Sequence, residues 1–187
     1  MGKGSDLTNH LLIAMPSLAD PNFAQSVTYL CEHTGEGALG IVINRPSGIR
    51  VGDLLEHLDI EVGDAGIADR PVFAGGPVQR ERGFVLHRPV GNWEASRAIT
   101  DELAITTSRD ILEAIARGDG PADWLLALGY AGWSEGQLEE ELAENAWLNG
   151  PATPEILFQH PLEERWRAAA ALLGVDLSRL SSQTGHA

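Results

Sequence analysis

Hydrophobic residues near the start of the chain alternate with polar ones, and a period of two is typical of a half-buried β-strand. The segment 26–33, SVTYLCEH, predicts such a strand, and the apolar, β-branched segment 38–44, ALGIVIN, predicts its neighbour. Residues 10–15, HLLIAM, predict an earlier buried strand. The alternation places four residues of 26–33 on one face: Val27, Tyr29, Cys31 and His33.

Helical spacing first appears at 51–58, VGDLLEHL, where the leucines recur on one helix face. The acidic segment 59–70 that follows contains two glycines and is expected to be a surface loop and the least ordered internal segment. Ser108 is then expected to cap a helix over 109–117, which Gly118 ends.

The second half of the chain contains two further helix signals. Ser134 is expected to cap a helix over 135–145, and Pro161 is expected to start the last long helix. Between the helices the pattern predicts short strands near residues 71–74, 83–88, 97–100, 103–107, 123–130 and 146–148.

These elements do not alternate regularly between strand and helix. Clustered strands with helices between some of them favour an α+β fold with a mixed, mostly antiparallel sheet over a doubly wound parallel sheet. The length of 187 residues suits one domain. We expect a single domain over 10–178, with a flexible N-terminal arm at 1–9 and a frayed tail at 179–187.

The stretch Gly35–Gly40, GEGALG, fits the dinucleotide fingerprint G-x-G-x-x-G. In that fold the glycines close a strand and open a helix that holds the pyrophosphate. Here Ile41 to Ile43 follow directly and favour a strand, and Pro46 would break a helix. The stretch therefore predicts a hairpin with its turn at 34–37, and no cofactor is expected.

The charge balance of the chain bears on its partners and location. Acidic residues number 27 against 13 basic ones, a net charge of -14, which disfavours direct nucleic-acid binding. The run from Leu11 to Met15 is too short for a signal-peptide core or a membrane span. Cys31 is the one cysteine, so no internal disulfide forms. We expect a cytoplasmic protein without membrane contact.

Two loops carry the best candidates for ligand binding. Asn44-Arg45-Pro46 closes a strand, and the Arg45 guanidinium is a planar fork suited to a carboxylate or phosphate. The alternative is structural: Asn44 pins the turn and Arg45 pairs with a nearby acid. The second loop, Gly75-Gly76-Pro77, could cradle an anion with its amide groups, or could simply be a tight turn. Side by side, the two loops would form a cleft.

Nucleophilic chemistry has one candidate, the thiol of Cys31. If Cys31 is reactive, His33 or His87 is expected to lower its pKa; the alternative is an inert core cysteine. The six histidines show no spacing typical of a metal site, and no metal is expected.

Three segments together resemble the YqgE/AlgH family of bacterial proteins. They are residues 20–48, DPNFAQSVTYLCEHTGEGALGIVINRPSG, residues 73–78, FAGGPV, and residues 128–148, LGYAGWSEGQLEEELAENAWL. The resemblance implies one α+β domain whose bifurcated sheet curls into a pseudo-barrel, and a bacterial cytoplasmic location. Some family members carry a transcriptional-regulator label linked to alginate production.

We therefore expect an accessory or regulatory protein, without enzymatic activity, that acts through a protein partner or a small ligand and regulates transcription indirectly. The alternative is an enzyme of unknown reaction with its cleft near Cys31, Asn44, Arg45 and the Gly75-Gly76 loop. Direct DNA binding is a third possibility and would require a concentrated basic face, which the sequence does not show.

Overall fold

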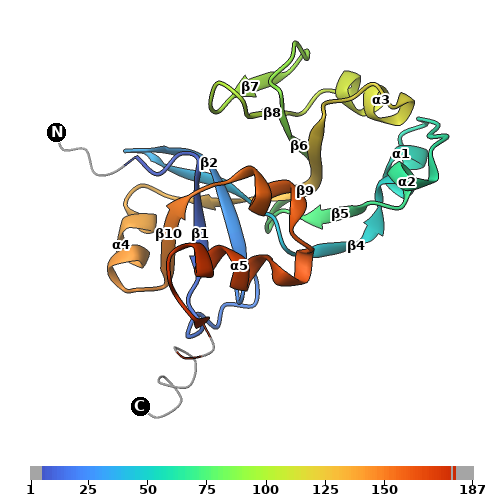
Figure 1. Ribbon diagram of the computed structural model, residues 1–187. Coiled ribbons are helices and arrows are strands. Elements are labelled where there is room, and N and C mark those ends of the chain that lie inside the picture. The colour runs from blue at the N-terminus through green and yellow to red at the C-terminus, as the bar shows by residue number, and fades with distance from the viewer. Residues whose placement is uncertain (1–5, 178, 180–187) are drawn as a thin grey trace.

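The computed structural model describes residues 6–177 and 179, and its strands form a curled sheet with helices around it (Figure 1). The strands are β1 (His10–Ala14), β2 (Val27–Thr34), β3 (Gly37–Val42), β4 (Pro46–Arg50), β5 (Pro71–Ala74), β6 (Val78–Arg88), β7 (Ser96–Ala98), β8 (Ala104–Thr106), β9 (Asp123–Trp133) and β10 (Trp147–Pro151). The α-helices are α1 (Val51–His57), α2 (Ala65–Ala68), α3 (Arg109–Arg117), α4 (Gln137–Ala143) and α5 (Arg165–Leu172). A π-helical segment (Glu155–Gln159) and a 3-10 turn (Leu162–Glu164) precede α5.

The fold is α+β, as predicted, with a largely antiparallel sheet curled into a half-barrel. Its main path runs β10-β1-β2-β3-β9-β6-β8-β7, and β4 and β5 lie off this path. The sheet divides at β9, which pairs with β6, with β5 at Ala127–Leu128, and with β3 at Ala131–Trp133. The β5–β9 pair is parallel, so the sheet is mixed.

The predicted hairpin at GEGALG is confirmed. Thr34 of β2 pairs with Gly37 of β3, leaving Gly35 and Glu36 as the turn, and Ile41 and Val42 are in the strand. Pairing shifts register between Leu30 and Glu32, so Cys31 is the extra residue of a β-bulge. This bulge interrupts the alternation on which the predicted common face of Cys31 and His33 depended.

Helix α3 matches its predicted bounds, and Gly118 ends it in the left-handed conformation. The predicted cap of the next helix is wrong, because Gly136 is the N-cap of α4. Ser134 instead donates from its backbone N–H and its hydroxyl to the side-chain oxygen of Gln137. The segment 59–70, expected to be a surface loop, contains the helix α2.

The apolar residues form three clusters around the sheet. The first lies between β1, β2, β3 and α5, the second surrounds α1, α3 and β9, and the third contains Trp133 and Trp147 beneath α4. Leu7 is buried in the third cluster, so the packed domain reaches into the predicted arm at 1–9. Residues 1–5 and most of the predicted tail lie outside the described residues.

Candidate ligand-binding cleft

The two loops singled out in the sequence lie side by side in the fold. Strand β4 pairs with β5 at Pro46 and Phe73, and the Ala74 amide donates to the Arg45 carbonyl at 2.7 Å. A cleft of about 480 Å³ opens between them, and we call it the arginine cleft. It is lined by Pro21, Asn22, Val42, Arg45, Pro46, Ser47, Ala74, Gly76, Pro77, Arg80 and Leu128.

Asn44 supports the arginine cleft without lining it. Its side-chain carbonyl accepts from the Val27 amide at 2.9 Å, and its side-chain NH₂ donates to the Gln25 carbonyl at 2.9 Å. Both hydrogen bonds connect the start of β2 to the segment that follows β3. The structural alternative stated for Asn44 therefore describes its contacts.

Arg45 also has a structural role, but its partners differ from the expected acid. Its guanidinium donates to the backbone carbonyls of Pro21, Asn22 and Ala24, and it forms no ion pair among the described residues. A cation held by neutral carbonyl groups keeps its full positive charge. Arg45 thus fixes one wall of the cleft and still contributes a positive potential to it.

The close approach of β9, rather than a ligand, explains the two glycines of the second loop. A Cβ on Gly76 would lie 2.1 Å from the Tyr130 carbonyl carbon, and a Cβ on Gly75 would lie 2.4 Å from the Gly129 carbonyl oxygen. The Gly75 amide donates to the Leu128 carbonyl at 2.8 Å. That amide is therefore unavailable to an anion, and Gly75 does not line the cleft.

Arg80 was not among the residues predicted for this cleft. It lies three residues after Pro77, on the irregular part of β6 where the register shifts between Val78 and Gly83. Arg45 and Arg80 are the two charged residues among the eleven that line the cleft, and both are basic. In a chain of net charge -14, this is a local reversal of sign.

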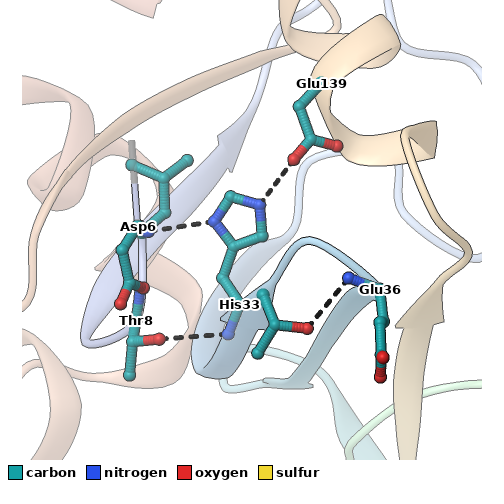
Figure 2. Close-up of polar contacts among 7 residues, drawn as sticks. Asp6, Thr8, His33, Glu36 and Glu139 are labelled. Carbon is teal, nitrogen blue, oxygen red and sulfur yellow. Dashed lines mark hydrogen bonds and ion pairs between the residues drawn. The ribbon is translucent and has the colours of Figure 1, made fainter. Parts of the chain in front are cut away.

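The histidine pairing that a reactive Cys31 would need is not formed, and the Cys31 thiol donates instead to the Tyr29 carbonyl at 3.9 Å. His33 accepts from the Leu7 amide through Nδ1 at 3.0 Å, and its Nε2 lies 2.8 Å from a carboxylate oxygen of Glu139. Figure 2 shows the His33 ring pointing toward Glu139. Its backbone amide donates to the Thr8 hydroxyl at 3.0 Å. Both ring nitrogens of His33 therefore interact with the N-terminal segment and with α4. Cys31 instead lines a different region, a pocket that also contains Glu32.

Neither Cys31 nor His87 has the environment of an activated group. Burial raises the pKa of the Cys31 thiol to about 12, so the thiol is protonated at neutral pH. His87 is fully buried and hydrogen-bonded with Thr106 and the Pro89 carbonyl, and burial lowers the pKa of its ring. Their surroundings are those of core residues.

Two other features are absent from the part of the chain that the structure describes. Among residues 6–177 and 179, no three His, Cys, Asp or Glu side chains are grouped as metal ligands. None of the helices in that part of the chain is both long and apolar enough to cross a membrane.

Comparisons with known proteins place the chain in a family. A family model described as AlgH-like, DUF179, matches residues 11–178. The chain belongs to the AlgH-like family. Its relatives include UPF0301 proteins of Thioalkalivibrio sulfidiphilus, 59% identical over 187 residues with both chains covered fully, and of Nitrosococcus oceani, 58% identical over 179 residues covering 96% of each.

Solved structures agree with this membership. The solution structure of the AlgH protein from Pseudomonas aeruginosa matches with a TM-score of 0.80 at 53% identity, covering all of both chains. A crystal structure of a protein from Corynebacterium diphtheriae matches with a TM-score of 0.73 at 20% identity, covering 97% of this chain and 94% of the other, and shows the shared fold alone. The family resemblance drawn from the three sequence segments is therefore confirmed.

Proposed function

We propose that this AlgH-like protein is a cytoplasmic accessory protein that binds a small anionic ligand in the arginine cleft. The observation that supports the proposal most directly is the charge of the cleft lining, where Arg45 and Arg80 face no acidic residue. A volume of about 480 Å³ also lies within the range of small-molecule pockets.

The acidic surface elsewhere does not prevent anion binding at this point. At physiological salt, exposed charges more than about 8 Å apart are largely screened from one another. An anion inside the cleft therefore responds mainly to the two arginines beside it. Arg80 presents a guanidinium that forms no ion pair among the described residues, and such a group binds carboxylates and phosphates with two parallel hydrogen bonds.

Membership of the AlgH-like family supports the further proposal that the protein regulates transcription indirectly. One relative of known structure is named AlgH, and regulation of transcription through a ligand or a protein partner fits a chain whose net charge repels DNA. The alternative of an enzyme near Cys31 lacks a supporting interaction, because the thiol is buried and neither His33 nor His87 forms a hydrogen bond with it.

A titration with simple anions tests ligand binding. We expect citrate or inorganic phosphate to raise the melting temperature of the wild-type protein and to bind in isothermal titration calorimetry. The variant Arg80→Gln should lose about tenfold in affinity, since it loses a charge-assisted contact without removing a packing residue. Arg109→Gln is the matched control, because Arg109 is exposed and pairs with Glu113 at 2.9 Å outside the cleft.

Two results would overturn the proposal of an anion site. One is the absence of any thermal or calorimetric response of the wild type to either anion. The other is equal affinity in the wild type and Arg80→Gln. A salt-resistant, sequence-specific gel shift by the pure protein would contradict the separate proposal that regulation is indirect.

A further inference from the structure

A second pocket lies where β2, β3, β6 and β9 meet the β7–β8 hairpin, and we call it the hairpin pocket. It has a volume of about 450 Å³ and shares no lining residue with the arginine cleft. Its lining comprises Cys31, Glu32, Leu39, Arg82, Phe84, Glu94, Ala95, Ser96, Arg97, Ile105, Thr107 and Tyr130. The two cavities therefore differ in location, and they also differ in chemistry.

Apolar and aromatic side chains supply much of the hairpin pocket. Phe84 of β6 and Tyr130 of β9 form an edge-to-face pair with ring centroids 5.8 Å apart. Leu39 and Ile105 approach from β3 and the hairpin, and the thiol of Cys31 is a neutral, buried part of the same wall. Such a lining favours an aromatic or branched aliphatic group over a fully polar ligand.

Four charged residues line this pocket, and two of them form an ion pair with each other. Arg97 and Glu32 form an ion pair at 3.0 Å. Arg82 lies over the Phe84 ring at 5.3 Å and donates to the Gln79 side chain at 3.3 Å, but it forms no ion pair in the described part of the chain. Glu94 likewise has no cationic partner there, while its backbone amide is held by the carboxylate of Asp110 at 2.8 Å.

The hairpin pocket thus offers one guanidinium and one carboxylate that do not pair with each other. A ligand with a carboxylate alone would meet Arg82 favourably and Glu94 unfavourably, and the reverse holds for a ligand with an ammonium alone. A ligand that carries both groups offers each of these two lining residues a partner of opposite charge. This arrangement contrasts with the arginine cleft, where no acidic residue opposes an anion.

We propose that the hairpin pocket binds an apolar α-amino acid in its zwitterionic form. The α-carboxylate accepts from the Arg82 guanidinium, the α-ammonium donates to the Glu94 carboxylate, and the side chain packs against Phe84, Tyr130 and Ile105. The proposal is independent of anion binding in the arginine cleft, because the two sets of residues do not overlap.

The test uses four ligands that share one side chain and differ in charge. L-phenylalanine carries both charges, N-acetyl-L-phenylalanine carries the negative one, L-phenylalaninamide carries the positive one, and N-acetyl-L-phenylalaninamide carries neither. In titrations followed by amide chemical shifts, L-phenylalanine should bind at least about tenfold more tightly than each of the other three. The shifted amides should lie around Phe84 and Tyr130.

Charge-neutralising variants test the two contacts separately. Arg82→Gln and Glu94→Gln should each weaken L-phenylalanine binding about tenfold, because each leaves one charge of the ligand without a partner. Arg80→Gln is the matched control: it removes an arginine two residues away on β6 that lines the other cavity, and it should leave L-phenylalanine binding unchanged. The same variant is expected to weaken citrate or phosphate binding, so the two proposals are tested in crossed experiments.

Three outcomes would overturn this inference. The first is no chemical-shift change in the wild type at about 10 mM L-phenylalanine, a concentration that detects even millimolar affinity. The second is equal binding of N-acetyl-L-phenylalanine, which would mean that the ammonium group is not recognised. The third is loss of binding in Arg80→Gln with retention in Arg82→Gln, which would place the amino acid in the arginine cleft. Anion binding by the wild type is unaffected by any of these results.

Discussion

The stretch Gly35–Gly40 and the stretch Gly75–Pro77 both resemble phosphate-binding loops in sequence, but the fold uses them differently. The first contains a hairpin turn, and a Cβ on Gly35 would meet no atom within 4 Å. The second is packed against β9, and its Gly76 and Pro77 line a cleft that also contains two arginines. Glycine content does not distinguish the two stretches, whereas the residues that fold against each one do.

The largest effect that this comparison predicts is for Gly76→Ala. The new Cβ would overlap the backbone of Tyr130, and Gly76 has a φ of 156°, which disfavours a residue with a side chain. We expect the free energy of unfolding to fall by about 3 kcal/mol or more. Urea denaturation measures this. Gly63→Ala is the control, since no atom lies within 4 Å of a Cβ there; similar losses in both variants would contradict the steric explanation.

Asn44→Ala should have the next largest effect, because the walls of the arginine cleft depend on its two hydrogen bonds. The substitution leaves the buried amide of Val27 without its acceptor, and we expect a loss of about 2 kcal/mol. For a chain of this length the melting temperature should fall by about 4–8 °C. Asn149→Ala, at an exposed position, serves as the control in the same melting experiment. An unchanged melting temperature for Asn44→Ala would show that the contacts with Gln25 and Val27 contribute little.

The smallest effect is expected for Gly35→Ala. The turn position is open, so the free energy of unfolding should change by less than about 0.5 kcal/mol. Citrate or phosphate affinity should also stay at the wild-type value, because no residue of the turn lines the arginine cleft. Isothermal titration calorimetry on this variant measures that affinity, and a large loss would show that the hairpin turn takes part in ligand binding.

The parts of the fold that the sequence predicted well depend on local signals. The hairpin at 34–37 follows from two strand-forming segments with glycines between them, and α3 follows from its apolar spacing and from Gly118. The start of α4 was predicted wrongly because Ser134 is a favourable cap residue, yet Gly136 adopts the left-handed conformation and takes that position. The local preference of Ser134 for a cap position therefore does not locate the start of this helix.

The candidate sites show the limit of sequence patterns more clearly. The bulge at Cys31 depends on how β2 pairs with β3, and it separates Cys31 from His33 although their spacing suggests a common face. The sequence suggested that Arg45, Pro46, Gly76 and Pro77 line one cleft. It did not suggest Arg80, which lines the same cleft because the register of β6 shifts between Val78 and Gly83. Such placements depend on how strands that are distant in the sequence pair with each other. The alternation of hydrophobic and polar residues along one strand does not reveal this pairing.

The position of β9 has a consequence for how the molecule unfolds. Because this strand pairs with β3, β5 and β6, all three strands lose a partner and the two halves of the sheet are no longer joined if β9 leaves. The two halves should therefore lose structure in one cooperative transition, with the slowest amide exchange along the middle of β9. A bound ligand on either side of that strand would then protect the whole sheet, including the half that it does not touch.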